Sequence, residues 1–346
     1  MFSFFSNKKS KQININNGEF MLEVQPKETI LQAALRENIK FPHSCRVGGC
    51  ATCKCKLTSG KVKELTESSY VLSEQELDQG YILACQSVPK TDLTLGLDID
   101  ASAPSHDCRT VNGVIKSQWK LTHDITGIEI ELEDALEYTA GQYAQLSIPE
   151  FTSESRSYSF ASPAQITDNN TIYFYIKRVD GGLLSTVIND QDLMNKKVVV
   201  EGPLGDFHLR ENSTPLLFIA GGSGLAPIKA ILEQAQTQDI NREAAFLFGA
   251  RTQADLYCLD YINDIAKNWQ NKFTFIPVLS HEPENSNWSG MRGLVTDAIA
   301  KTVGGTEQAY LCGPPGMIDA SIEELQKYSI STSNIYFDKF LSKADL

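Results

Sequence analysis

The sequence lacks the features that would point to a membrane span, to export or to nucleic-acid binding. No stretch of the 346 residues approaches the ~20 apolar residues of a membrane-spanning helix, and residues 1–11 lack the apolar core of a secretory signal. Basic residues number 31 against 43 acidic ones, so a phosphate backbone is disfavoured as the main partner. There are no internal repeats. The length and the 42% hydrophobic content indicate a globular protein of two or three domains, which we expect to be cytoplasmic.

What the sequence does contain is an uneven set of eight cysteines. Cys45, Cys50 and Cys53 have the spacing C-x4-C-x2-C, and Cys85 follows after thirty-one intervening residues. This spacing is typical of plant-type [2Fe–2S] ligands. A structural zinc site fits less well, because zinc sites prefer paired knuckles and here one cysteine stands alone. The sequence therefore predicts that these four cysteines hold a [2Fe–2S] cluster and that Cys55 is a buried thiol instead of a ligand.

Patterns on both sides of the cysteine loop predict one small α+β unit. Asn17-Gly18 separates two alternating runs and is typical of a tight β-hairpin. Thr29 and Gln32 form a capping-box pattern before a short helix. We expect residues 1–97 to fold as a β-grasp ferredoxin domain. The polar stretch 98–107 is predicted to be a linker.

Two further domains are expected after the linker. Strand-like runs separated by turns predict an antiparallel barrel or sandwich over residues 108–210, and we expect a six-stranded barrel there. From residue 211 onward, continuous apolar strands alternate with helical patterns, which predicts a parallel α/β domain extending to residue 346. The predicted barrel strands are residues 110–115, 125–132, 142–148, 171–179 and 197–201, and the predicted parallel strands are 216–220, 244–248, 273–278 and 309–311.

Four short motifs in these two domains resemble those of the ferredoxin–NADP⁺ reductase superfamily, in the same order. Residues 156–162 (RSYSFAS) resemble its flavin motif and residues 181–185 (GGLLS) its flavin-phosphate loop. Residues 221–227 (GGSGLAP) and 312–317 (CGPPGM) resemble its two nicotinamide loops. With the ferredoxin domain included, the resemblance covers nearly the whole chain. It is strongest to the NADH-dependent reductase components of bacterial oxygenases.

The resemblance implies how a flavin would be bound. Arg156 would bind the pyrophosphate, Tyr158 would pack on the isoalloxazine ring and Ser159 would bond near its N5 atom. A string such as Arg-Ser-Tyr-Ser is in itself also typical of an exposed strand face. The resemblance favours FAD over FMN, and we expect the barrel to have room for an adenylate. The remaining residues assigned to flavin or nucleotide binding in the barrel are Ser157, Lys177, Gly181, Gly182, Leu183 and Ser185.

The glycine loop after residues 216–220 has the strand–turn–helix context of a dinucleotide site. Gly221, Gly222 and Gly224 would permit close approach of the pyrophosphate. In the resembling family the cysteine that corresponds to Cys312 lies near nicotinamide C4, and the loop continues through Gly313 and Pro314. A small buried residue is the alternative role for that cysteine.

The coenzyme preference is predicted from two residues with opposite effects. Asp255 would suit a ribose 2′-hydroxyl, whereas Arg251 would attract a 2′-phosphate. The resemblance favours NADH. Near the C-terminus, Phe340 is the candidate for the aromatic ring that relatives place over the flavin. A core strand is the alternative interpretation of that segment.

These expectations predict an NADH:acceptor oxidoreductase. Electrons would pass from NADH to FAD, then to the [2Fe–2S] cluster and on to an oxygenase component, because a flavin can accept a hydride and release single electrons. Ser159 and Cys312 would be the catalytic residues. The setting favoured by resemblance is aromatic or alkyl hydrocarbon oxidation, by a monomer, with peripheral association to a membrane-bound oxygenase left open. The alternatives are a stand-alone flavin or ferric reductase and a redox-sensing binding protein.

Overall fold

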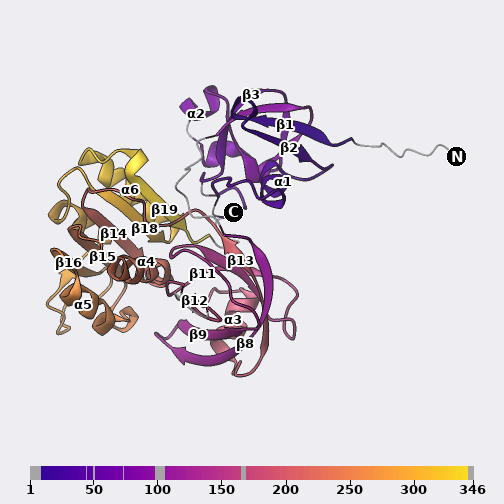
Figure 1. Ribbon diagram of the computed structural model, residues 1–346. Helices are drawn as coiled ribbons and strands as arrows, with labels where there is room; N and C mark the ends of the chain where they lie inside the picture. Colours follow the sequence, from indigo (N-terminus) through magenta and orange to yellow (C-terminus); the bar gives the residue numbers. More distant parts are fainter. Residues whose placement is uncertain are drawn as a thin grey trace. The chain divides into compact units, whose positions relative to one another are not determined.

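The computed structural model describes residues 9–43, 45–49, 51–72, 74–97, 106–164 and 169–341. Two compact units are present, an N-terminal unit that ends at residue 105 and a C-terminal unit that begins at His106 (Figure 1). Most of the predicted linker 98–107 lies outside the described residues. No helix within the described ranges is long and apolar enough to cross a membrane.

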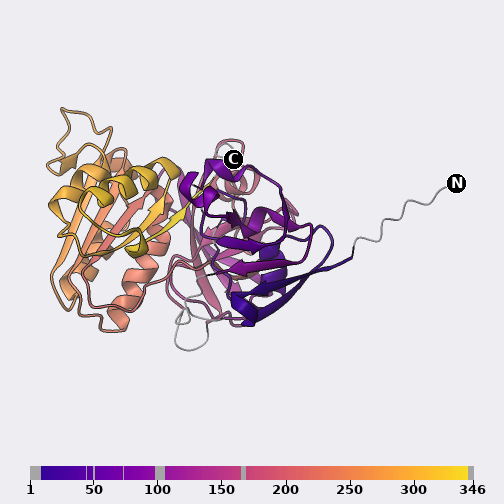
Figure 2. The same ribbon diagram turned by 90° about the horizontal axis from the view of Figure 1, so that it is seen from above.

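The N-terminal unit is built on a five-stranded mixed sheet in the order β2-β1-β7-β3-β5. Figure 2 shows its strands lying side by side. The first strand pairs antiparallel with β2 and parallel with β7, as expected of a β-grasp fold. The elements are β1 (Lys11–Ile15), β2 (Phe20–Val24), α1 (Ile30–Arg36), β3 (Lys54–Ser59), β4 (Val62–Glu64), α2 (Glu74–Asp78), β5 (Tyr81–Leu83), β6 (Ser87–Pro89) and β7 (Leu93–Gly96).

The first hairpin differs from the tight turn that the sequence predicts. The last paired residues are Ile15 and Phe20, so four residues form the loop. The Asn16 side chain donates to the carbonyl oxygen of Leu97 and accepts from its N–H, both at 2.8 Å. These two bonds tie the loop to a residue distant in sequence. The predicted capping box is present, with Thr29 Oγ1 accepting from Gln32 N at 3.2 Å.

The C-terminal unit begins with a nearly closed antiparallel barrel of six strands in the order β11-β10-β13-β8-β9-β12. A bridge between Phe160 and Phe174 joins the two edges of the sheet. The predicted six-stranded antiparallel barrel is thus confirmed. Its elements are β8 (Arg109–Lys120), β9 (Ile125–Leu132), β10 (Tyr143–Ser147), β11 (Arg156–Ser159), β12 (Thr171–Lys177), α3 (Leu183–Asp190) and β13 (Lys197–Leu204).

A six-stranded parallel sheet follows, in the order β17-β16-β15-β14-β18-β19. In Figure 1, α6 lies on one face of this sheet and α4 and α5 lie on the other. Phe340, the candidate for the ring over the flavin, directly follows the edge strand β19. The elements are β14 (Leu216–Gly221), α4 (Leu225–Thr237), β15 (Ala244–Ala250), α5 (Leu259–Asn268), β16 (Phe273–Leu279), β17 (Met291–Arg292), β18 (Gln308–Gly313), α6 (Pro315–Lys327) and β19 (Ile335–Lys339).

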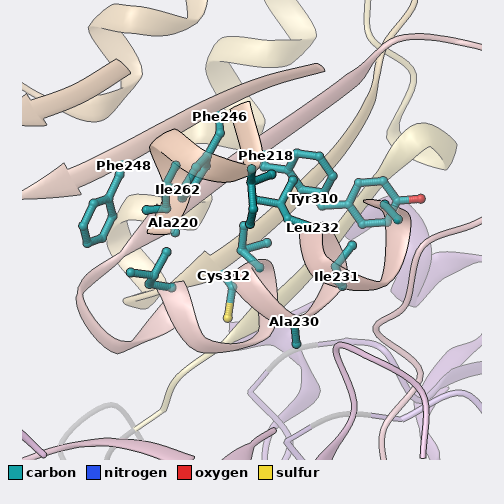
Figure 3. Close-up of a cluster of buried hydrophobic side chains, with 14 of the residues drawn as sticks. Phe218, Ala220, Ala230, Ile231, Leu232, Phe246, Phe248, Ile262, Tyr310 and Cys312 are labelled. Carbon is teal, nitrogen blue, oxygen red and sulfur yellow. The ribbon is translucent and has the colours of Figure 1, made fainter. Parts of the chain in front are cut away.

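The core between the sheet and the helices α4 and α5 leads directly to Cys312. Successive side chains of a strand point to opposite faces, so Phe218 and Ala220 of β14 point towards these helices. Figure 3 shows Cys312 at the lower edge of this cluster, and Cys312 is the register partner of Ala220. The apolar core therefore positions the end of β18 next to the start of α4.

Candidate functional site

The strand pair β3–β5 brings two of the predicted cluster ligands together. Cys53 directly precedes β3, and Cys85 lies in the short turn Ala84–Gln86 that follows β5. The Ala84 N–H donates to the carbonyl oxygen of Cys53 at 3.0 Å, which joins the two cysteine segments directly. Cys53 and Cys85 are buried and Cys45 is partly buried. Cys50 lies outside the described residues.

The donors around these sulfur atoms fit an iron–sulfur cluster. Gly49 N donates to Cys45 Sγ at 3.3 Å, and Gln86 Nε2 donates to Cys85 Sγ at 3.7 Å. Arg46 Nη1 in the same loop is buried and has no hydrogen-bond partner among the described residues. A buried guanidinium nitrogen requires nearby negative charge, which thiolate ligands would supply.

The remaining thiol of this unit, Cys55, behaves as a structural residue. Its side chain is buried within the core of the N-terminal unit. Burial, and to a lesser extent the nearby Cys85, raises the pKa of this thiol to about 12. Cys55 is thus a buried, protonated thiol, and its exclusion from the ligand set stays a prediction from the cysteine spacing.

Gln86 is a residue near the predicted cluster that the sequence analysis did not identify. Its side chain packs on Gly48, where an added Cβ would lie 2.7 Å from Gln86 Cγ. Its amide thus donates to Cys85 Sγ from a fixed position, and such a bond stabilises the more negative, reduced cluster. The sequence around Cys85 does not reveal this contact, because it depends on where the Gln86 side chain lies in the folded structure.

We expect Gln86→Leu to lower the midpoint potential of the cluster. Loss of about 1.4 kcal/mol of preferential stabilisation of the reduced form would correspond to about 59 mV for a one-electron couple. An EPR-monitored redox titration measures the shift, and the flavin potential in the same protein serves as an internal control. A fully loaded variant with an unchanged cluster potential would contradict the role of the amide.

The strand β11 carries the predicted flavin-binding side chains at one edge of the barrel. Ser159 is buried, whereas Ser157 is exposed and Arg156 and Tyr158 are partly buried. The Arg156 guanidinium contacts Glu154 Oε2 at 2.5 Å and donates to the carbonyl oxygen of Ser155 at 2.8 Å. Because arginine has five N–H donors, further donors remain for a phosphate in addition to this ion pair.

At the turn formed by Gly181 and Gly182, the backbone N–H groups suit an anionic group better than the Ser185 hydroxyl does. Gly182 is the N-cap residue of α3, and no side chain caps this helix. Gly181 has φ +71°, with open space at the position of a Cβ atom. The Ser185 hydroxyl accepts from Val179 N at 3.2 Å and so helps to close the turn. The backbone N–H groups of the first turn of α3, beginning at the exposed Leu183, are thus the donors that suit a phosphate.

The two predicted nicotinamide loops pack backbone against backbone. An added Cβ on Gly224 would lie 2.2 Å from the carbonyl oxygen of Cys312, and one on Gly313 would lie 3.0 Å from that of Gly221. Gly224 is the N-cap of α4 and no side chain caps this helix, which leaves N–H donors for a pyrophosphate. This glycine cradle fits a dinucleotide.

Two side chains that come from outside the glycine motif reach the Gly222 turn. The fully buried Tyr257 hydroxyl donates to the carbonyl oxygen of Gly222 at 2.9 Å. The predicted binding residue Lys177, at the end of β12, places Nζ 3.8 Å from the position that a Cβ on Gly222 would occupy. Lys177 also forms an ion pair with Asp124 at 3.4 Å. The barrel therefore contributes a cation to the nucleotide loop.

Cys312 is a buried, neutral thiol. Burial raises its pKa well above the usual range, and the Asp338 carboxylate raises it further. Asp338 is the residue paired with Cys312 in the β18–β19 ladder, and its side chain is also buried. The sequence analysis missed Asp338 because it considered only the aromatic residues of this segment. The N–H of Phe340 donates to the carbonyl oxygen of Gly313 at 2.9 Å, and the exposed Pro314 is the N-cap residue of α6.

The carboxylate of Asp255 is largely occupied by contacts within the protein. Its Oδ2 accepts from both the N–H and the hydroxyl of Thr252 at 2.9 Å, and its Oδ1 lies 3.4 Å from His123 Nδ1. Arg251 is exposed. The sequence suggests that Arg251 and Asp255 favour different coenzymes. Of the two side chains, Arg251 is the more available to a ligand, because the Asp255 carboxylate is engaged by Thr252 and His123. Both residues line a pocket of about 550 Å³ whose other lining residues are His123, Thr252, Ala254 and His281.

Family models match three consecutive parts of the chain. A 2Fe-2S iron-sulfur cluster binding domain matches residues 13–90, an oxidoreductase FAD-binding domain matches residues 112–209, and an oxidoreductase NAD-binding domain matches residues 218–323. The predicted fold class and the predicted cofactors, a [2Fe–2S] cluster, FAD and NADH, are thereby confirmed. The individual site residues remain predictions.

Full-length relatives are found among oxygenase components. The chain is 37% identical to the xylene/toluene monooxygenase electron transfer component XylA of Pseudomonas putida, covering 96% of this chain and 94% of the relative. It is 34% identical to the phenol 2-monooxygenase reductase component DmpP of Pseudomonas sp. strain CF600, covering 94% and 93%. The Amycolatopsis cytochrome P450 reductase GcoB has a similar structure, with a TM-score of 0.80, 31% identity and coverage of 95% and 98%. The chain belongs to the family of reductase components of oxygenases, oxidoreductases that join a 2Fe-2S domain to FAD- and NAD-binding domains in one polypeptide.

Proposed function

We propose that this protein passes electrons from NADH, through FAD and a [2Fe–2S] cluster, singly to the oxygenase component of a hydrocarbon-oxidising system. The observation that carries the proposal is the presence of both halves of such a path in one chain. One half is the N-terminal cysteine set with its N–H···S donors. The other is the backbone-packed glycine cradle beside the buried Cys312. A regulator without turnover would not require both.

The chain's own residues would act by binding and orientation. A bound flavin would supply the step between two-electron and one-electron chemistry. Gly222 and Gly224 would hold the dinucleotide pyrophosphate at the start of α4, and the Cys312 loop would support the nicotinamide. Because the Cys312 thiol keeps its proton, it places no negative charge at that position. The buried Ser159 hydroxyl would orient the flavin edge by a hydrogen bond, while Arg156 would bind its phosphate.

The substrate class and the setting are part of the proposal. Relatives named for xylene/toluene, phenol and propane monooxygenases support an oxygenase that acts on aromatic or short alkyl hydrocarbons. We place the reaction in the cytoplasm, because the predicted cluster needs cysteines that are not joined in disulfides, and a reducing compartment keeps them so. We expect a monomer that docks on its oxygenase, with peripheral membrane contact only through such a partner.

Purified holo-protein tests the proposal. With NADH as donor, we expect rapid reduction of cytochrome c and product formation when a hydrocarbon oxygenase and its substrate are added. Failure to reduce cytochrome c would exclude the reductase function. Reduction of cytochrome c, flavins or ferric complexes without coupling to any oxygenase tested would instead favour a stand-alone reductase.

A further inference from the structure

A buried ion pair joins the helix α4 to the flavin-binding barrel within the C-terminal unit. Lys229 lies on α4, five residues after Gly224, and its side chain is only 9% exposed. Its Nζ lies 2.6 Å from Glu233 Oε1 and donates to the carbonyl oxygen of Ala161 at 3.2 Å. Ala161 lies two residues after Ser159. The ammonium group thus links the helix of the nucleotide loop to the segment that follows the flavin strand β11.

The aromatic ring of Tyr261, on α5, completes the cluster. Lys229 Nζ lies 4.3 Å from the centroid of this ring, within the range of a cation–π contact. The Tyr261 hydroxyl donates to the same Glu233 Oε1 that contacts Lys229. Glu233 Oε2 is buried and has no hydrogen-bond partner in the described part of the chain. The carboxylate therefore depends on Lys229 and Tyr261 for its compensation.

Such an ion pair is an inefficient way to stabilise a fold. Burying two charges costs hydration energy that their attraction only partly offsets, and apolar residues of similar volume often stabilise as much. Lys229 also restricts the position of α4, because its ammonium group contacts a carboxylate on its own helix and one backbone carbonyl on the barrel at the same time. The pair therefore fixes where α4 lies relative to Ala161.

A second contact across the same junction holds the nucleotide loop itself. Tyr175 of β12 packs edge-on against Tyr257, with ring centroids 5.9 Å apart, and Cys258 Sγ contacts the Tyr175 hydroxyl at 3.8 Å. Tyr257 in turn donates to the carbonyl oxygen of Gly222. Both contacts connect a barrel strand or the segment after it to the Gly222–Gly224 turn and its helix. The position of α4 and the Gly222 turn against the barrel therefore sets the position of the proposed nucleotide loop relative to the proposed flavin-binding segment.

We propose that Lys229 is a positioning residue for hydride transfer, acting through α4 and the Ala161 carbonyl. The proposal rests on the proposed function of these loops. Reacting atoms must approach to about 3–3.5 Å, and a displacement of about 1 Å can slow a reaction about 100-fold. Releasing α4 from Ala161 would disturb this approach while leaving the contacts of each cofactor with its own loop in place.

The test uses Lys229→Met in the holo-protein, because methionine is unbranched, keeps most of the length of the lysine side chain and removes the charge. Lys327→Met is the matched control, since Lys327 pairs with Glu324 on α6 at 2.7 Å but is 68% exposed and remote from the barrel contacts. Rapid mixing with NADH gives the limiting rate of flavin reduction and the Kd for NADH separately. The long-wavelength charge-transfer absorbance of the nicotinamide–flavin complex reports their stacking.

For Lys229→Met we expect a 10- to 100-fold lower limiting rate, about the loss associated with a small misplacement. The charge-transfer absorbance should weaken, while the Kd for NADH and the FAD content change little. Lys327→Met should match wild type in all four. Wild-type rate and absorbance in a fully loaded Lys229→Met protein would overturn the proposal.

Two further variants keep the proposal falsifiable if Lys229→Met does not retain FAD. Glu233→Gln keeps the shape of the ion pair without its charge and should lower the rate and the absorbance in the same direction. Lys229→Arg, which retains a cation, should restore most of both. Wild-type behaviour of a loaded Glu233→Gln protein would overturn the positioning role. If NADH did not reduce the flavin of the wild-type protein, the proposed function itself would fail instead.

Discussion

Replacing Cys85 with serine should abolish electron transfer to one-electron acceptors and leave reduction of the flavin by NADH close to wild type. Cys85 is the predicted fourth ligand and is held against Cys53 by the Ala84–Cys53 backbone bond. Changes in outer-shell residues alone cost up to about 100-fold in metal affinity, so loss of a ligand should reduce cytochrome c turnover by more than that. Loss of the cluster should not impair flavin reduction, because the N-terminal unit has its own core.

Visible absorbance and EPR of the cluster, together with stopped-flow reduction of the flavin, measure these two outcomes in one preparation. Cys55→Ala is the matched control, because Cys55 is equally buried in the same unit but is not a predicted ligand. It should keep the cluster and most of the cytochrome c activity. A Cys55→Ala protein without a cluster, or a Cys85→Ser protein with a normal one, would show that the ligand set is wrong.

The sequence predicts those parts of the site whose residues lie close together in the chain. Three of the four predicted cysteine ligands lie in one loop, and the glycine motif around Gly222 depends on a strand directly followed by a helix. Each motif also reflects one chemical need. The cluster needs converging thiolates, and the dinucleotide needs a backbone without Cβ atoms. The strands themselves, though not their order within each sheet, follow from alternating and continuous apolar patterns in the same local way.

The parts that the sequence does not reveal are contacts between distant segments. Lys229 meets Ala161 across 68 positions of the chain, and Asn16 meets Leu97 across 81. Asp338 becomes a neighbour of Cys312 only because β19 pairs in register with β18. No periodicity distinguishes such a lysine or aspartate from one on a solvated face, so tertiary packing alone identifies them.

The glycine cradle leads to the second large expected effect. In Gly224→Ala the added methyl group would lie 2.2 Å from the carbonyl oxygen of Cys312 and 2.8 Å from Gly313 N, both backbone atoms. The backbone at Gly224 has φ −61° and ψ −11°, which alanine adopts without strain, so the clash is the only change. The Cys312 backbone cannot retreat freely, because β18 is paired in register with β14.

Either α4 or the Cys312 loop must therefore move in Gly224→Ala, and the proposed dinucleotide site should be lost. We expect kcat/KM for NADH to fall about 100-fold, the loss that a displacement of about 1 Å can cause, with FAD and cluster content retained. NADH-dependent cytochrome c reduction measures the fall, and chemical reduction by dithionite should still reduce both centres. Gly96→Ala is the control, because Gly96 lies outside both nucleotide loops and its added Cβ meets only Lys56 Cβ, at 3.8 Å. Equal behaviour of the two variants would mean that the close packing of Gly224 on Cys312 does not form the nucleotide site.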